Sequence, residues 1–305
     1  MPVSVESVSR RGFLKASLLV GAATLFPSGV TLGASEVEPP LAGHDYLALL
    51  SDTHVSGSAV AGLMASRLST AIRQVLALSR RPQKVLFAGD CAHLKGTRGD
   101  YREFVRRIEP LIEAGLPLHM ALANHDHRLR FWDALPRGRT DTTMPAPRQT
   151  MVVPGQYADW YLLDSLNQDD PDEAELGRDQ LDWLAGQLDA RSPKPAVIML
   201  HHDVARGGGK PWLNDSAMLL ALAEARPQVK AIFLGHMHVW STVQRPSGLH
   251  LVNLPATGYT LFGRSFLGWV GCALDSSGAT LRVHALGARD QRRHDQMVRL
   301  NWRQA

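Results

Sequence analysis

The chain has 305 residues, of which 45% are hydrophobic and 20% are charged, the composition of a globular protein with one main core. Its formal net charge of +4 falls to +2 when residues 1–34 are set aside, which is too weak to indicate a nucleic-acid partner. The two cysteines, Cys91 and Cys272, are too few for a disulfide framework and lie in no zinc-finger spacing.

The N-terminus carries two adjacent arginines ahead of an apolar run. Residues 9–15 read Ser-Arg-Arg-Gly-Phe-Leu-Lys, and residues 16–26 are mostly apolar. This pattern resembles a twin-arginine export signal; the alternative is a basic, frayed helix. The run stops at Pro27, too short to span a bilayer. We therefore expect a signal peptide at residues 1–35, read by the twin-arginine export machinery, and a periplasmic or secreted mature chain without a membrane span.

Five short apolar runs follow a linker at residues 36–44, and each ends in a cluster of Asp, Asn or His. The runs are residues 46–50, 84–88, 117–123, 196–200 and 231–234. Helical patterns lie between them at residues 60–80, 100–113, 178–190 and 215–225. Alternating strands and helices predict an α/β fold with parallel strands and helices outside. Because the carboxyl ends of parallel strands share one edge of a sheet, we expect the polar clusters to meet there.

The last third changes character. Its predicted strands are residues 249–254, 266–274 and 280–286, and the turn at residues 275–278 makes a hairpin of the last two, which we expect to close a second sheet. The charged tail, residues 288–305, is expected to be a solvated helix or a frayed end. The predicted domain therefore spans residues 45–287.

Seven side chains at these strand ends form one set of possible metal ligands: Asp52, His54, Asp90, Asn124, His201, His236 and His238. Oxygen and nitrogen donors without a thiolate suit manganese, iron, zinc or cobalt. A bridging carboxylate can hold two ions about 3.5–4 Å apart, while imidazoles leave each ion acidic enough to ionise water. In an extended segment, the Asp-x-His and His-x-His spacings would direct both side chains to one side. The sequence therefore predicts a site for two divalent or transition-metal ions.

The order of these blocks, D-x-H, G-D, G-N-H-[DE], H and G-H-x-H, resembles that of the calcineurin-like metallophosphoesterase superfamily over residues 45–260. The resemblance implies a four-layer α/β/β/α sandwich of two mixed β-sheets flanked by helices. It implies that the first ion is held by Asp52, His54 and His238, and the second by Asn124, His201 and His236, with Asp90 bridging both. It also implies that His125 is the catalytic histidine and that Asp126 orients it.

Several positions in and around these blocks depart from the family pattern or allow two roles. Ala123 stands where the family usually has glycine, which would cost about 1–2 kcal/mol if the turn needed a positive φ; we expect an ordinary backbone there. His93 stands where purple acid phosphatases place a tyrosine, so we reject that subtype. His201 is preferred over His202 as the ligand because it directly follows the strand. His93 and His127 are read either as phosphate contacts or as polar loop residues.

These residues predict a metal-dependent phosphoester hydrolase, in which a hydroxide bridging the two ions attacks phosphorus and His125 protonates the leaving oxygen. The substrate is expected to be a small phosphoester. We favour a phosphodiesterase like the cyclic-nucleotide and glycerophosphodiester branch, because no extra domain is apparent; a phosphomonoesterase or nucleotide pyrophosphatase is the alternative. A non-catalytic periplasmic protein that binds metal or phosphate is the alternative of another class, although it would not need His125 and Asp126.

Overall fold

The computed structural model describes residues 45–304 apart from 59–61, 139–146, 168–172, 205–211, 262–264 and 288–292. The expected signal peptide and linker lie outside the described residues. None of the described helices is long and apolar enough to cross a membrane.

The strands form two six-stranded sheets. The first has the order β12-β11-β10-β1-β2-β3, with β1 (Asp45–Leu50), β2 (Lys84–Phe87), β3 (Leu118–Met120), β10 (Gly268–Asp275), β11 (Gly278–Ala285) and β12 (Met297–Asn301). The second has the order β4-β5-β6-β7-β9-β8, with β4 (Met151–Val153), β5 (Asp159–Leu162), β6 (Ala196–Met199), β7 (Val229–Leu234), β8 (Ser241–Gln244) and β9 (His250–Asn253). Both sheets mix parallel and antiparallel pairs.

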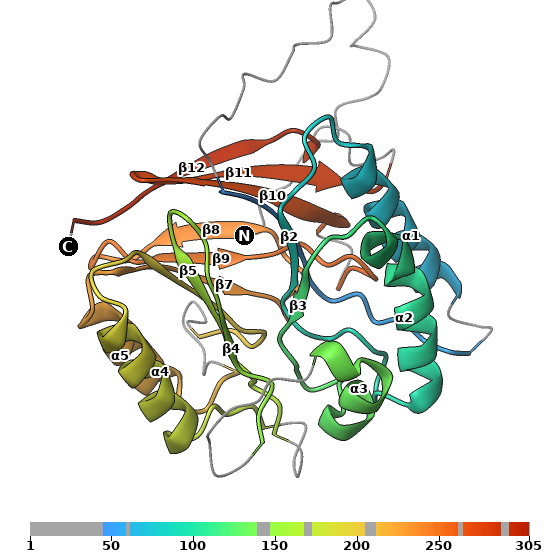
Figure 1. The fold of residues 1–305 in the computed structure, drawn as a ribbon, viewed down its shortest axis with the longest axis horizontal. Helices are drawn as coiled ribbons and strands as arrows, with labels where there is room; N and C mark the ends of the chain where they lie inside the picture. Colours follow the sequence, from blue (N-terminus) through green and yellow to red (C-terminus); the bar gives the residue numbers. More distant parts are fainter. Residues whose placement is uncertain are drawn as a thin grey trace, which may run out of the picture. The chain divides into compact units, whose positions relative to one another are not determined.

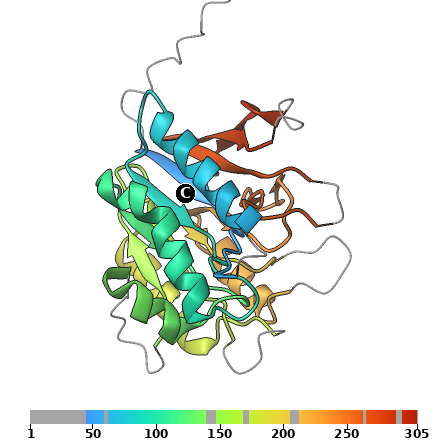
Figure 2. The same ribbon diagram turned by 90° about the vertical axis from the view of Figure 1, so that its right-hand side faces the viewer.

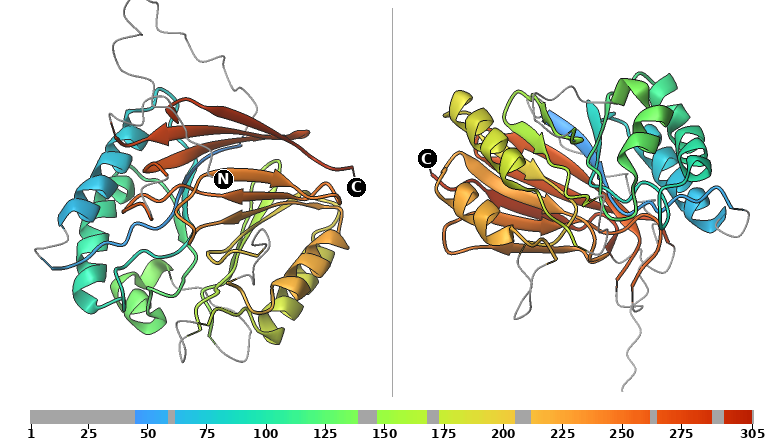
Figure 3. Two further views of the ribbon diagram at one scale, coloured as in Figure 1. Left: turned by 180° about the vertical axis from the view of Figure 1, so that it is seen from behind. Right: turned by 90° about the horizontal axis from the view of Figure 1, so that it is seen from below.

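Helices cover the outer face of each sheet (Figures 1 and 3). The first sheet carries α1 (Gly62–Ala77) and α2 (Arg98–Glu113), which run side by side in Figure 2, and the short α3 (Arg128–Ala134), followed by a 3₁₀ turn at Pro136–Gly138. The second sheet carries α4 (Arg178–Ala190) and α5 (Ser216–Glu224). The four-layer sandwich implied by the family resemblance is therefore confirmed.

Three hydrophobic cores hold the layers together. One lies between the first sheet and its helices, a second between the two sheets, and a third between the second sheet and α4 and α5. The helix α2 shows how sequence sets the contact: Tyr101, Phe104, Ile108 and Leu111 form one buried stripe. Its first turn is closed by a capping box between Thr97 and the Asp100 side chain, an arrangement that contributes about 1 kcal/mol.

The structure corrects two expectations about the sheets. The hairpin of β10 and β11 forms as expected, but β10 pairs with β1, so the hairpin extends the first sheet and does not close the second. The strands that precede the ligand motifs are divided, with β1, β2 and β3 in the first sheet and β6 and β7 in the second. The second sheet also contains β4, β5 and β8, for which the apolar pattern predicted no strand.

The charged tail is also different from the expectation of a solvated helix or frayed end. Residues 297–301 form β12, an edge strand that pairs antiparallel with β11 from Gly278↔Asn301 to Arg282↔Met297. Leu300 is buried in the core between the sheets, and Trp302 packs there too. These two apolar side chains outweigh the charged neighbours, so the end of the chain belongs to the fold.

Candidate metal centre

The seven expected ligands follow the carboxyl ends of five strands, β1, β2, β3, β6 and β7, and the two sheets are joined at this point. The imidazole Nδ1 of His201, after β6, lies 2.8 Å from the carbonyl oxygen of Ala88, after β2. The backbone N–H of His236, after β7, donates to both carboxylate oxygens of Asp52, after β1, over 3.2 and 3.3 Å. The ligand loops of both sheets therefore meet at one edge of the sandwich.

Five of the seven expected ligands adopt the left-handed backbone conformation: Asp52, His54, Asp90, His236 and His238, with φ between 45° and 66°. Each such residue costs roughly 1–2 kcal/mol. The expectation of an extended backbone at the two x-spaced pairs is therefore wrong, and it is the left-handed turn that directs alternate side chains into the centre. Strain of this kind is found mainly at functional sites, where surrounding structure enforces it.

Asp52, His54 and His238 form a first group. The Nε2 atom of His238 lies 3.1 Å from Oδ1 of Asp52, and Nε2 of His54 lies 3.7 Å from the same oxygen. The two Nε2 atoms are 3.2 Å apart. The Nδ1 atom of His238 lies 2.7 Å from the carbonyl oxygen of Tyr259, so Nδ1–H donates there and Nε2 is the ring nitrogen that faces the carboxylate. This is the donor arrangement that one cation would need.

Asp90 joins this group to His201. Its Oδ2 atom lies 3.1 Å from Nε2 of His201 and 3.6 Å from Nε2 of His54. His201 also lies 3.7 Å from Oδ1 of Asp52. All four side chains are buried. A carboxylate between histidines of both groups is in the position that a bridging ligand requires.

Nε2 of His201 and Oδ1 of Asn124 are buried polar atoms of expected ligands that have no hydrogen-bond partner. Because Nδ1–H of His201 donates to the carbonyl of Ala88, Nε2 is the ring nitrogen that can bind a cation in place of a proton. An unpaired buried polar atom costs about 1–3 kcal/mol, and a bound cation would satisfy both atoms. The residues present therefore fit the metal ions that the sequence predicts.

His236 and Asn124 are placed at the centre by indirect contacts. The ring of His236 lies 5.3 Å from that of His201, centroid to centroid. Asn124 is followed by His125, whose backbone N–H donates to Oδ1 of Asp90 over 3.1 Å. The ring of His236 therefore lies beside that of His201, and Asn124 directly precedes a residue that is bonded to Asp90.

The charges of the centre compensate one another. Burial raises the pKa of Asp90, but nearby histidines, His201 first, outweigh it and hold the pKa far below its ordinary value. The pKa of Asp52 is held low in the same way. Burial lowers the pKa of His201, but Asp90 and Asp52 outweigh it and raise the pKa to about 9. Two buried carboxylates thus attract positive charge, which two cations would supply more fully.

His125 lies beside the centre with its ring partly exposed. Its Nε2 atom is 4.0 Å from Oδ2 of Asp90, and its Nδ1 atom is 3.0 Å from the carbonyl oxygen of Leu94. The carbonyl can only accept, so Nδ1 keeps its hydrogen and Nε2 is the atom that can gain or lose a proton. His125 is therefore oriented by Leu94.

The expectation that Asp126 orients His125 is not supported by these contacts. The Asp126 carboxylate instead accepts hydrogen bonds from the backbone N–H groups of Cys91, Ala92 and Ala123, at 3.2–3.4 Å, and from the Tyr101 hydroxyl at 3.1 Å. It therefore ties the loop after β2 to the loop after β3. Asp126 supports the positions of Asp90 and Asn124 and acts on the centre through the backbone.

Three further residues of the ligand loops are Ala123, Cys91 and His202. Ala123 is not among the residues with positive φ, so its methyl group causes no strain. Cys91 is buried in the core between the first sheet and its helices. His202 pairs its Nδ1 with the hydroxyl of Ser165 over 2.8 Å and packs its ring 4.8 Å from that of His236. The geometry thus favours His201 as the ligand.

Two aromatic side chains border the centre. The ring of Tyr259 lies 4.6 Å from that of His54 and 4.5 Å from that of His238. The ring of Trp212 lies 4.9 Å from that of His236. Sequence analysis missed Tyr259, which belongs to none of the metal-binding blocks. Its place shortly after β9, a strand parallel to β7, is the signal that could have found it.

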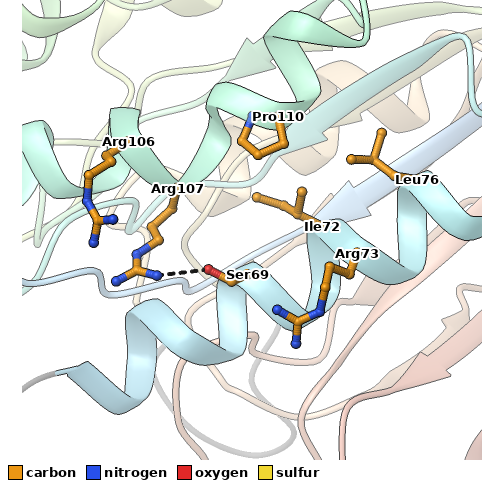
Figure 4. A pocket seen from close by; sticks show the side chains of 7 residues that line it. All are labelled: Ser69, Ile72, Arg73, Leu76, Arg106, Arg107 and Pro110. Carbon is orange, nitrogen blue, oxygen red and sulfur yellow. Dashed lines mark hydrogen bonds between the residues drawn. The ribbon is translucent and has the colours of Figure 1, made fainter.

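Two other features of the described residues lie apart from this centre. Figure 4 shows a hollow of about 260 Å³ between α1 and α2, lined by Ser69, Ile72, Arg73, Leu76, Arg106, Arg107 and Pro110, with none of the expected ligands. A second cluster holds His284, His294 and Asp295. There the backbone N–H of Ala285 donates to Nδ1 of His294, which leaves the hydrogen on Nε2, and Arg282 pairs with Asp295. His294 and Asp295 therefore have protein partners, whereas the buried Nε2 of His284 has none among the described residues.

The family model for calcineurin-like phosphoesterases matches residues 46–240, and the model for the twin-arginine translocation signal sequence matches residues 7–27. The latter match indicates export by the twin-arginine pathway, to the periplasm or outside the cell. A 3′,5′-cyclic-nucleotide phosphodiesterase of Nostoc is 30% identical over 95 residues, which are 30% of this chain and 35% of that protein. The chain thus matches about a third of that relative's length.

Two solved structures share the fold at low sequence identity. A dimetal phosphatase from Danio rerio is 14% identical, with a TM-score of 0.65 over 85% of this chain and 99% of the other. A purple acid phosphatase from yellow lupin seeds is 13% identical, with a TM-score of 0.57 over 84% of this chain and 53% of the other. At these identities the likeness concerns the fold.

Proposed function

The chain belongs to the calcineurin-like phosphoesterase family and is a phosphoester hydrolase, and from that premise we propose that it is a two-metal phosphodiesterase. The observation that carries the proposal is the junction of the two sheets, where Asp90 lies between His54 and His201. The proposed ligands of the first ion are Asp52, His54, Asp90 and His238, and those of the second are Asp90, Asn124, His201 and His236. Manganese, iron, zinc and cobalt suit these donors.

Two ions bound there would supply the charge that ionises an attacking water near neutral pH and neutralises the phosphoryl oxygens. The protein itself holds the donors in strained, buried positions and supplies a proton to the leaving oxygen. A bond forms between the oxygen of water and phosphorus, and the bond from phosphorus to the leaving oxygen breaks. We assign the proton that the leaving oxygen needs to Nε2 of protonated His125; the proton lost by the attacking water passes to solvent, and the neutral His125 takes one up from solvent before the next turnover.

Two observations favour diesters over monoesters. The one relative named above is a cyclic-nucleotide phosphodiesterase, although the match covers 95 residues. The arginines that follow His125 are also engaged elsewhere: Arg128 pairs with Asp164 over 2.7 Å, and Arg130 donates to the carbonyls of Lys95 and Gly96. A monoester carries a second negative charge, and arginine is the residue that most often binds a dianionic phosphate. A diester makes no such demand.

The proposal is tested with two chromogenic substrates, bis(p-nitrophenyl) phosphate and p-nitrophenyl phosphate, assayed on the exported mature protein with added manganese. We expect the higher kcat/KM with the diester. A preference for the monoester would assign the site to a phosphomonoesterase. If the protein contains metal and hydrolyses neither substrate, the result would favour a non-catalytic protein that binds metal or phosphate.

A further inference from the structure

Four large apolar side chains are exposed on the segments that follow the ligands of the metal centre, three on loops and one, Leu129, in the first turn of α3. They are Leu94 (60% exposed), Leu129 (64%), Trp212 (41%) and Val239 (40%), here called the apolar rim. Leu94 comes four residues after Asp90, and Leu129 five residues after Asn124. Val239 directly follows His238, and Trp212 packs against the ring of His236. The rim therefore accompanies the ligand loops of both sheets.

Single exposed apolar residues are ordinary on protein surfaces, but the backbone of Leu94 is not ordinary. Its φ is +54°, a conformation that costs a leucine about 1–2 kcal/mol and that asparagine or glycine would adopt more easily. The side chain gains little burial in return. The strained backbone is therefore not offset by burial of the side chain, and the residue is better explained by what it contacts in the bound state.

The rim residues lie on both flanks of the centre. The carbonyl of Leu94 holds His125, and Arg130, next to Leu129, donates to the carbonyls of Lys95 and Gly96 over 3.3 Å. This joins the Leu94 and Leu129 segments on the side of His125. Trp212 and Val239 belong to the His236 and His238 side. A phosphoester bound at the ions would therefore meet apolar side chains around its organic groups.

We infer that the phosphodiester substrate carries a large apolar organic group, which the apolar rim removes from water. This inference rests on the proposed function and adds a substrate class to it. A small polar alcohol such as glycerol would leave the rim in water and gain nothing from it. An alkyl chain or an aromatic ring would be recognised by the same apolar chemistry.

The test is a homologous series of alkyl p-nitrophenyl phosphates from methyl to octyl, with a phenyl ester added, assayed below their critical micelle concentrations. The leaving group is constant, so kcat/KM reports contact with the varied group. We expect kcat/KM to rise roughly twofold for each added methylene, about half the effect of full burial. A gain for phenyl but not for octyl would identify a stacked ring as the group bound.

The matched variants change the rim and substitute none of the proposed ligands. In the triple variant Leu129→Ser, Trp212→Ser and Val239→Ser, the ratio of kcat/KM for the octyl ester to that for the methyl ester should fall to near one. Ile112→Ser is the control. Ile112 is 48% exposed and lies at the C-terminal end of α2, roughly 20 Å along the helix from Thr97 at its N-terminal end. Its ratio should equal that of the parent. Leu129→Ser alone should lower the ratio if the triple variant does not fold.

Failure of the inference is distinct from failure of the proposed function. If the methyl ester is hydrolysed and neither longer chains nor phenyl give any gain, the apolar substrate class is wrong while the diesterase stands. If only monoesters react, the diesterase is wrong, and the same ratio is measured with octyl and methyl phosphate by release of phosphate. An equal loss of the ratio in the Ile112 control would also overturn the role of the rim.

Discussion

His125 presents Nε2 to the metal centre because the carbonyl of Leu94 occupies the other side of the ring. We predict that His125→Ala slows a diester with an alkyl leaving group by roughly 10²–10⁴-fold and affects a p-nitrophenyl leaving group far less, since p-nitrophenolate leaves without a proton. Metal content should not change. His119→Gln, on β3 before the ligand loop, serves as the control. An equal loss with both leaving groups would show that His125 is not the proton donor.

Also at the scale of single residues, His284 is a buried histidine outside the centre. Its ring stacks on Trp269 with 3.9 Å between centroids. Burial, then the neighbouring His294, lowers its pKa to about 3 from an ordinary 6.5. The unfolded chain therefore takes up a proton near pH 6.5 that the folded chain does not accept until about pH 3. Stability is lost as pH falls through that window and is unaffected above it.

The variant His284→Phe keeps the stacked ring and removes this titration. Between pH 6 and pH 4.5, the parent's free energy of unfolding should fall more steeply than the variant's, by about 1.4 kcal/mol per pH unit. Urea unfolding at several pH values measures both slopes. Parallel slopes would mean that His284 titrates normally in the folded chain.

Some of the site could be foreseen residue by residue and some could not. The Asp-x-His and His-x-His pairs were identifiable because their spacing is local. The left-handed conformation of Asp52 and His54 was not, because no glycine or asparagine marks it and the surrounding fold enforces it. The hydrogen-bond partners of Asp126 could not be foreseen, because adjacency to His125 says nothing of where a carboxylate turns; that depends on backbone N–H groups from two loops.

At the scale of elements, the tail strand β12 shows where composition misleads. Its charged residues suggested a solvated end, but Leu300 is 2% exposed and packs between the sheets. We predict that Leu300→Ala lowers the free energy of unfolding by about 2–5 kcal/mol, the usual cost of a cavity in a core. The control Met297→Ala, at a position 66% exposed on the same strand, should change it by less than about 0.5 kcal/mol. Equal small effects in urea unfolding would mean that the strand is frayed in solution.

The helix α2 and the two ligand loops form a connected unit. The Tyr101 hydroxyl donates to Asp126 and accepts the backbone N–H of His127 over 2.7 Å, from a fully buried position. The helix stripe that includes Tyr101 could be found from its period of 3.6 residues. Tyr101 also holds the loop that carries Asn124 and His125. That role depends on contacts between distant segments of the chain, which the periodicity of the sequence does not show.

At the scale of the whole molecule, helix and strand order predicted the α/β class, and the family resemblance supplied the four layers. Which strands share a sheet was not deducible from order alone, because β6 and β7 repeat the pattern of β1 and β2 while lying in another sheet. The division matters for function. Asp52 and Asp90 follow strands of one sheet, and His201, His236 and His238 follow strands of the other. The centre therefore forms only when the two sheets are correctly packed against each other.

That dependence makes metal content the most direct measure of the central claim, that donors from both sheets hold a pair of ions. Elemental analysis of the purified, exported protein should find about two transition-metal ions per folded chain. The variant Asp90→Asn replaces the carboxylate between His54 and His201 by a neutral amide. Its metal content and phosphodiesterase activity should fall together while the fold is retained. A folded parent protein that hydrolyses diesters while holding no metal, or an Asp90→Asn variant with unchanged metal and activity, would contradict the account.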